Sequence, residues 1–151
     1  MAPGTTHLLL RIAAILWVVW GLVHMLAGFV IMSSDTPGAV AAVADAIDPD
    51  TLKGPYPDAA GALINQHGFN LFWIGATTLI CAVLMWRRSI NAIFIAALVG
   101  GLADLGYFIF LDLGGFVKFV PGTVMTLVSS SAIILSFWAY FKGLKGGAPE
   151  A

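Results

Sequence analysis

The stretch Ile12–Met32, with the sequence IAAILWVVWGLVHMLAGFVIM, decides the fold of this chain. A helix needs about 20 mostly apolar residues to cross the ~30 Å hydrocarbon core of a bilayer. This stretch meets that length, and His24 is its only ionisable residue. It therefore predicts a membrane-spanning helix.

Three further stretches of the same character follow, from about Ala62 to Trp86, from about Ala92 to Leu111 and from about Gly122 to Phe141. In lipid only helices and closed barrels satisfy their own backbone, and these runs are too continuous for barrel strands. The predicted fold is an all-α membrane protein, a four-transmembrane-helix bundle that forms one domain over residues 1–142. Residues 143–151, which include Gly146-Gly147-Ala148-Pro149, predict a flexible tail.

The composition agrees with a membrane protein and excludes other classes. Of the 151 residues, 60% are hydrophobic and 10% are charged, against about 45–50% and about 25% in a soluble domain. A net charge of −1 offers no basic surface for nucleic acid. The single cysteine, Cys81, rules out an intrachain disulfide and Cys-based metal motifs. Membrane lipids are the expected partners, and the Gly- and Ala-rich helix faces leave a homo-oligomer or a partner in a membrane complex open.

Basic residues set the orientation of the spans. Five of them lie before the first span, between the second and third, or after the fourth: Arg11, Arg87, Arg88, Lys142 and Lys145. The other two loops hold only Lys53 and Lys118. Because cytoplasmic loops carry the excess of Lys and Arg, this pattern predicts cytoplasmic termini in a multi-pass protein of a bacterial-type inner membrane.

The first external loop, residues 33–61, predicts one short amphipathic helix on the outer membrane surface or over the mouth of the bundle. Thr36 is placed as its N-cap and Pro37 as its first helical residue. Val40, Val43 and Ile47 then recur at helical spacing, and Asp48-Pro49 ends the pattern.

Three of the four spans carry an ionisable side chain, and these are His24, His67 and Asp104. An Asp at the centre of a membrane helix costs roughly 2.5–3.5 kcal/mol on insertion scales. Counted from the outer end of each span at 1.5 Å per residue, the three lie within roughly 5 Å of one another in depth. The sequence therefore predicts a single polar layer in the external half of the bundle.

Helical spacing adds neighbours to this layer. Trp17 and Trp20 share a face with His24, Asn70 lies on the arc of His67, and Tyr107 shares a face with Asp104. Thr126 and Ser130 fall at the same depth in the fourth span. The small-residue pairs Ala96/Gly100 and Ala97/Gly101 predict a close helix crossing in the cytoplasmic half and a wider opening in the external half.

This pattern favours a binding pocket for a small, lipophilic ligand such as a quinone, a sterol-like molecule or a lipid. The predicted ligand-binding residues are His24, His67, Asn70, Asp104, Tyr107, Trp17 and Trp20. Haem ligation by His24 and His67, or a metal site of His24, His67 and Asp104, is an alternative that no CxxCH or HExxH motif supports. No catalytic signature is present, so a binding protein is favoured over an enzyme.

A structural role is the remaining alternative, in which the polar residues only hold the helices together. The outline, with four spans and a longer loop after the first, is similar to that of small bacterial membrane proteins of the DoxX type. Only this layout is shared, and it implies no function for this chain.

Overall fold

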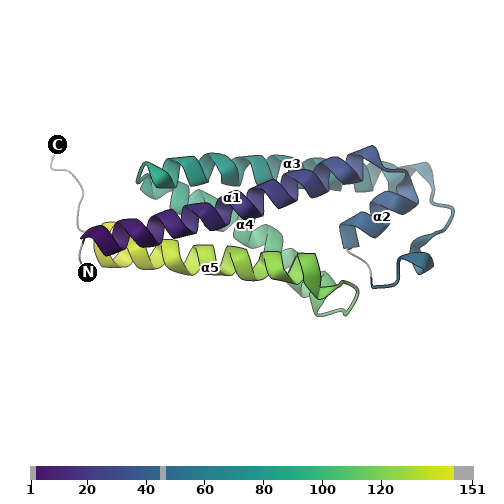
Figure 1. Ribbon diagram of the computed structural model, residues 1–151. Coiled ribbons are helices and arrows are strands. Elements are labelled where there is room, and N and C mark those ends of the chain that lie inside the picture. The colour runs from purple at the N-terminus through teal and green to yellow at the C-terminus, as the bar shows by residue number, and fades with distance from the viewer. Residues whose placement is uncertain (1–2, 45–46, 145–151) are drawn as a thin grey trace.

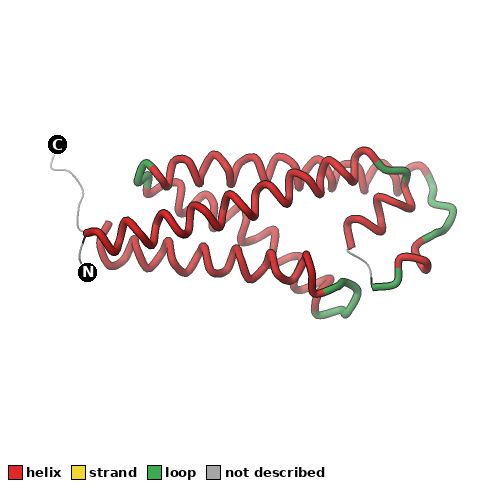
Figure 2. The backbone as a smooth tube through the Cα atoms, viewed as in Figure 1, coloured by secondary structure: helices red, strands yellow, loops and turns green. Residues whose placement is uncertain are grey.

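The computed structural model describes residues 3–44 and 47–144, and these residues form an all-helical structure without β-strands. The main helices are α1 (Pro3–Ser33), α2 (Thr36–Ala44), α3 (Asp58–Trp86), α4 (Ile90–Tyr107) and α5 (Val124–Ala139). Shorter segments are the 3-10 helix η1 (Pro49–Leu52) and the π-helical turns η2 (Phe108–Asp112) and η4 (Tyr140–Leu144). The segment η3 (Phe119–Thr123) contains a kink at Val120, whose backbone is not helical. The loops between the long helices are confined to the two ends of the molecule (Figure 2).

Four helical segments are long and apolar enough to cross a membrane: Gly4–Ser33, Asp58–Trp86, Ile90–Asp112 and Phe119–Gly143. This confirms the prediction of a helical bundle with four potential spans. Each segment extends beyond its predicted span at one or both ends, because a helix continues to satisfy its own backbone hydrogen bonds past the apolar stretch.

The four long helices run side by side along the length of the molecule, and the described chain begins and ends at the same end (Figure 1). We call this the terminal end and the other the loop end, where α2 lies. The most extensive helix contact is between α1 and α3; α1 also packs on α5, and α4 packs on both α3 and α5.

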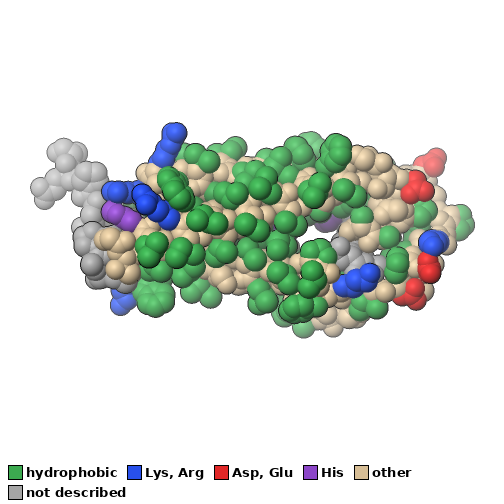
Figure 3. Space-filling view, in the orientation of Figure 1, with side chains coloured by type: hydrophobic (Ala, Val, Ile, Leu, Met, Phe, Trp, Pro, Cys, Tyr) green, Lys and Arg blue, Asp and Glu red, His purple; other side chains and the backbone are tan. Residues whose placement is uncertain are grey.

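Charged side chains are distributed unevenly between the two ends of the bundle. Most of the basic side chains lie toward the terminal end, and the visible acidic side chains gather at the loop end (Figure 3). The excess of basic side chains near the termini is the pattern from which cytoplasmic termini were predicted. The side of the membrane on which the termini lie stays a prediction.

The helix α2 lies over the loop end of the bundle and contacts both α1 and α3. Its cap differs from the predicted one, because Asp35 accepts a hydrogen bond from the backbone N–H of Gly38 (3.1 Å). Thr36 is therefore already helical and Pro37 follows it in the first turn. The predicted residue Ile47 lies beyond the helix, Asp45 and Ala46 are outside the described residues, and the amphipathic character of α2 stays a prediction.

Glycines bring α1 and α3 into backbone contact at two levels. A Cβ atom added at Gly21 would lie 2.8 Å from the carbonyl oxygen of Gly75, and one added at Gly75 would lie 2.5 Å from that of Gly21. About two helical turns closer to the loop end, Gly28 lies against Gly68 in the same way. These glycines therefore form a contact between two helices of the same chain. We call this contact the glycine seam.

The apolar core lies in the terminal half of the bundle, where all four long helices meet. Trp17, Met85 and Ile93 are fully buried there. Gly100 lets α4 approach α1, since a Cβ at this position would lie 2.8 Å from the Cη2 atom of Trp17. This close approach at Gly100 is in the half where the small-residue pair Ala96/Gly100 predicted it, and both residues are buried. Ala97 and Gly101, the second predicted pair, are only partly buried.

Candidate functional site

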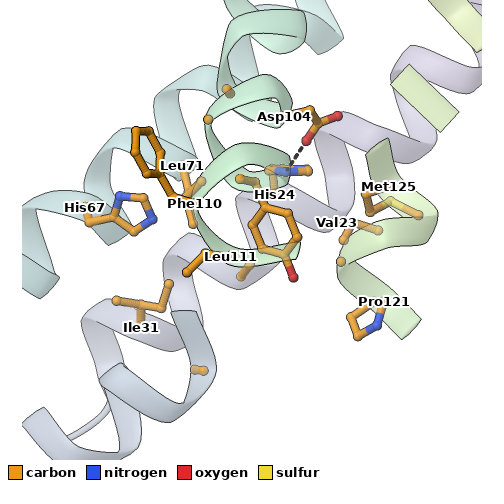
Figure 4. Close-up of a pocket in the computed structure, with 16 residues that line it drawn as sticks. Val23, His24, Ile31, His67, Leu71, Asp104, Phe110, Leu111, Pro121 and Met125 are labelled. Carbon is orange, nitrogen blue, oxygen red and sulfur yellow. Dashed lines mark ion pairs between the residues drawn. The ribbon is translucent and has the colours of Figure 1, made fainter. Parts of the chain in front are cut away.

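A cavity of about 460 Å³ lies in the loop half of the bundle, beyond the packed core. It is bounded by all four long helices, and α2 contributes one residue to its wall (Figure 4). The residues that line it are Val23, His24, Ala27, Ile31, Ala42, His67, Leu71, Ala103, Asp104, Gly106, Tyr107, Phe110, Leu111, Pro121, Gly122 and Met125.

A π-helical turn and a kinked segment flank the cavity. Helix α4 changes to the π-helical turn Phe108–Asp112, and the fourth span begins at a kink, where the backbone of Val120 is not helical (φ −115°, ψ 130°). A π-helical turn alters the direction of the side chains that follow and occurs often at functional sites. A hydrogen bond from Thr123 to Asp112 (2.5 Å) joins the two segments.

His24 and Asp104 form the polar end of the cavity. Nε2 of His24 lies 3.7 Å from Oδ1 of Asp104, and the pair joins α1 to α4 (Figure 4). Asp104 is only 4% exposed. Ser129 is buried on α5, and its hydroxyl donates to the backbone carbonyl oxygen of Thr126 (3.1 Å). The predicted meeting of a histidine and an aspartate within one layer is confirmed for this pair.

Trp20 fixes the geometry of both partners. Its indole N–H donates to Oδ2 of Asp104 at 2.6 Å, and its ring stacks on the imidazole of His24 with the centroids 3.6 Å apart. Nδ1 of His24 lies 2.9 Å from the carbonyl oxygen of Trp20. Because a carbonyl oxygen can only accept, Nδ1 carries the proton and Nε2 faces the carboxylate. Trp20 thereby orients the pair from behind.

His67 and Tyr107 also line the cavity, but they are separate from the pair. His67 comes from α3 and lies beside Leu71, away from the His24–Asp104 ion pair (Figure 4). The hydroxyl of Tyr107 lies against Gly122, where any side chain at position 122 would collide with it. The predicted layer is therefore one cavity with two distinct polar positions.

Three of the seven predicted site residues do not line the cavity. Trp17 and Trp20 are fully buried behind it, with their rings in an edge-to-face contact at 5.7 Å, and so they do not form its walls. Asn70 instead accepts a hydrogen bond from the indole N–H of Trp73 on its own helix (3.0 Å). Trp17 Nε1 has no hydrogen-bond partner among the described residues.

The sequence analysis missed Ser129 and most of the apolar wall. Ser130 was placed in the layer, but Ser130 is exposed, whereas its neighbour Ser129 is buried. A difference of one residue turns a side chain by about 100° around a helix. The sequence shows that serine and threonine residues lie near the depth of Asp104. It does not show the rotation of α5, which decides which of them faces the bundle.

The geometry gives little support to a metal or haem site. Among the described residues, no group of three or more His, Cys, Asp or Glu side chains is placed to hold a metal ion. Nε2 of His24 is directed at Asp104, so ligation together with His67 would require the imidazole to turn away from that carboxylate. His24 and His67 remain the only candidate pair that lines the cavity.

Comparisons with protein families, with characterised proteins and with solved structures found no match to this chain.

Proposed function

We propose that this protein is a multi-pass membrane protein that binds a small, mostly apolar ligand in the cavity of its loop half. The polar end of the ligand lies at His24 and Asp104. The observation that carries the proposal is the pairing of an apolar chamber with one buried, oriented polar couple.

The walls suit a lipophilic body with little polarity. Val23, Ile31, Leu71, Phe110 and Met125 contribute apolar surface from four different elements. A volume of about 460 Å³ falls within the range of roughly 300–1,000 Å³ that is typical of small-molecule sites. A few convergent polar groups among apolar walls are the other common property of such sites.

The position of the cavity supports access from the membrane or from its outer face. The space-filling view shows a hollow between α1 and α5 beside α2, with a histidine side chain at its edge (Figure 3). With the termini in the cytoplasm, as the basic residues predict, this hollow lies in the external half of a bacterial-type inner membrane. A lipophilic molecule dissolved in the bilayer reaches the chamber at that depth.

A structural role for the polar residues is the second candidate. The hydrogen bond from Trp20 to Asp104 joins α1 to α4 across the bundle. Such contacts hold membrane helices in register at about 0.6 kcal/mol each on average. In this alternative the chamber holds only ordinary lipid chains.

Native mass spectrometry of protein purified without added ligand tests the proposal. We expect a bound molecule that is lost in Ala27→Phe, which fills the chamber from α1, and kept in Leu26→Phe. Leu26 is the adjacent position and is 63% exposed on the outer surface. Equal retention in both variants would place the molecule elsewhere. The structural role would be favoured by two results together: no molecule bound to the wild-type protein, and a lower stability of His24→Ala and Asp104→Ala.

A further inference from the structure

We propose that the ligand carries a hydroxyl group at its polar end, bound between Nε2 of His24 and Oδ1 of Asp104. This inference rests on the proposed function, because it names the chemical class of the ligand in the same cavity.

The separation of these two atoms is the first argument. At 3.7 Å they are too far apart for a direct hydrogen bond. They are close enough for one oxygen atom to lie about 2.8 Å from each of them. Both residues line the cavity, so the position between them is open to a hydroxyl group of a molecule that occupies it.

The other polar atoms of the couple are already engaged by Trp20. Its carbonyl oxygen lies 2.9 Å from Nδ1 of His24, and its indole N–H lies 2.6 Å from Oδ2 of Asp104. These contacts fix the imidazole and the carboxyl group from the side away from the gap. The gap therefore has a defined pair of atoms, one nitrogen and one oxygen.

The count of protons decides what this gap accepts. Nδ1 carries a proton, since its partner is a carbonyl oxygen. One more proton, on either Nε2 or Oδ1, leaves the couple without net charge, which is the least costly arrangement in an apolar setting. The gap then offers one hydrogen-bond donor and one acceptor.

A hydroxyl oxygen matches both atoms, because it donates one hydrogen bond and accepts another. An ether or carbonyl oxygen only accepts, and an ammonium group only donates. Either of these leaves one buried polar atom without a partner. The structure therefore favours an alcohol or a phenol with an apolar body, such as a long-chain alcohol or a sterol-like molecule.

Photolabelling in phosphatidylcholine vesicles tests this choice, because these lipids carry no hydroxyl group. The probe is dodecan-1-ol with a diazirine in mid-chain. Its matched control carries a terminal fluorine of nearly the same size and no proton to donate. Peptide mass spectrometry assigns the labelled residues. We expect saturable labelling of cavity residues by the alcohol, at about a tenfold lower membrane concentration than by the fluoride.

Variants identify which residues hold the hydroxyl group. His24→Phe keeps a ring to stack on Trp20 but removes both nitrogens, and we expect it to abolish the preference for the alcohol. His7→Phe makes the same change near the start of α1 and should keep the preference. If His67→Phe removes the preference and His24→Phe does not, the polar end lies at the other histidine and the inference is wrong.

The comparison of the two probes on the wild-type protein and on Ala27→Phe decides between the two proposals, whether or not His24→Phe folds. Equal cavity labelling by both probes, blocked by Ala27→Phe, would overturn the hydroxyl inference and leave the proposed function intact. Labelling confined to the outer surface of the bundle, with no saturation by either probe, would overturn both.

Discussion

In the terminal half of the bundle, Trp17, Met85 and Ile93 are fully buried where four helices meet. In the loop half, the same four helices surround a cavity of about 460 Å³. The small residues Ala92, Ala96 and Gly100 lie in the terminal half and let α4 approach closely.

The glycine seam shows which helices open the cavity. Gly21 and Gly75 hold α1 and α3 together beside the core, and Gly28 and Gly68 do so beside the cavity. The α1–α3 pair is thus in backbone contact in both halves. The chamber lies where α4 ends in the π-helical turn Phe108–Asp112 and where the fourth span begins at the kink of Val120. The cavity therefore has a tightly packed side, formed by α1 and α3, and a more open side, formed by α4 and the fourth span.

A Met→Ala substitution in each half gives the strongest test of the difference between the packed core and the cavity. Met85→Ala removes a fully buried side chain from the core, and we expect it to lower the free energy of unfolding by about 3 kcal/mol. Met125 is only partly buried and lines a chamber that already exists, although it also packs against the core, so we expect Met125→Ala to cost about 1 kcal/mol. Equilibrium unfolding in a mixed detergent system measures both.

Equal losses for the two methionines would show that the chamber is closed around Met125 in the membrane. The cavity would then not exist as an open space, and the proposal that it binds a ligand would lose its basis.

The glycine seam gives the next largest effect. A Cβ at Gly28 would lie 2.7 Å from the backbone nitrogen of Phe72 and against the carbonyl oxygen of Gly68. Backbone atoms cannot turn aside as a flexible side chain can, so we expect Gly28→Ala to lower the free energy of unfolding by about 2 kcal/mol.

Gly106→Ala is the matched control for this change. A Cβ at Gly106 meets no atom within 4 Å, and alanine favours a helix over glycine by roughly 0.5–1 kcal/mol. We expect no loss of stability there. A loss at Gly106 as large as that at Gly28 would show that the α1–α3 pair is not the firmer part of the bundle.

The sequence predicted the spans and the main polar pair for physical reasons. An apolar run of about 20 residues has few alternatives to a membrane helix. An ionisable residue within such a run needs a partner. Depth along each span then placed His24 and Asp104 at one level, where the structure brings them to 3.7 Å.

The sequence could not predict which residues separate the two halves. Gly28 lies one helical turn after His24 in the sequence and so falls near its face, but only the structure shows that it meets the backbone of α3. Asn70 was placed in the pocket because its helical phase allowed it, and the nearby Trp73 engages it instead. Helical phase gives a direction for each side chain, but the partner in that direction depends on the relative rotation of two helices.

The two buried tryptophans provide the finest comparison of the halves. Trp17 and Trp20 are both fully buried, so Trp→Phe removes the same atoms from each. Trp20 also loses its hydrogen bond to the carboxyl group of Asp104, whereas Trp17 Nε1 has no partner among the described residues.

A hydrogen bond to a charged group contributes roughly 1.5–3 kcal/mol in soluble proteins and less on average between membrane helices. We therefore expect Trp20→Phe to cost about 1 kcal/mol more than Trp17→Phe, measured in the same unfolding assay. Equal costs would mean that Trp20 does not hold the couple in place, and the gap between His24 and Asp104 would lose its fixed width.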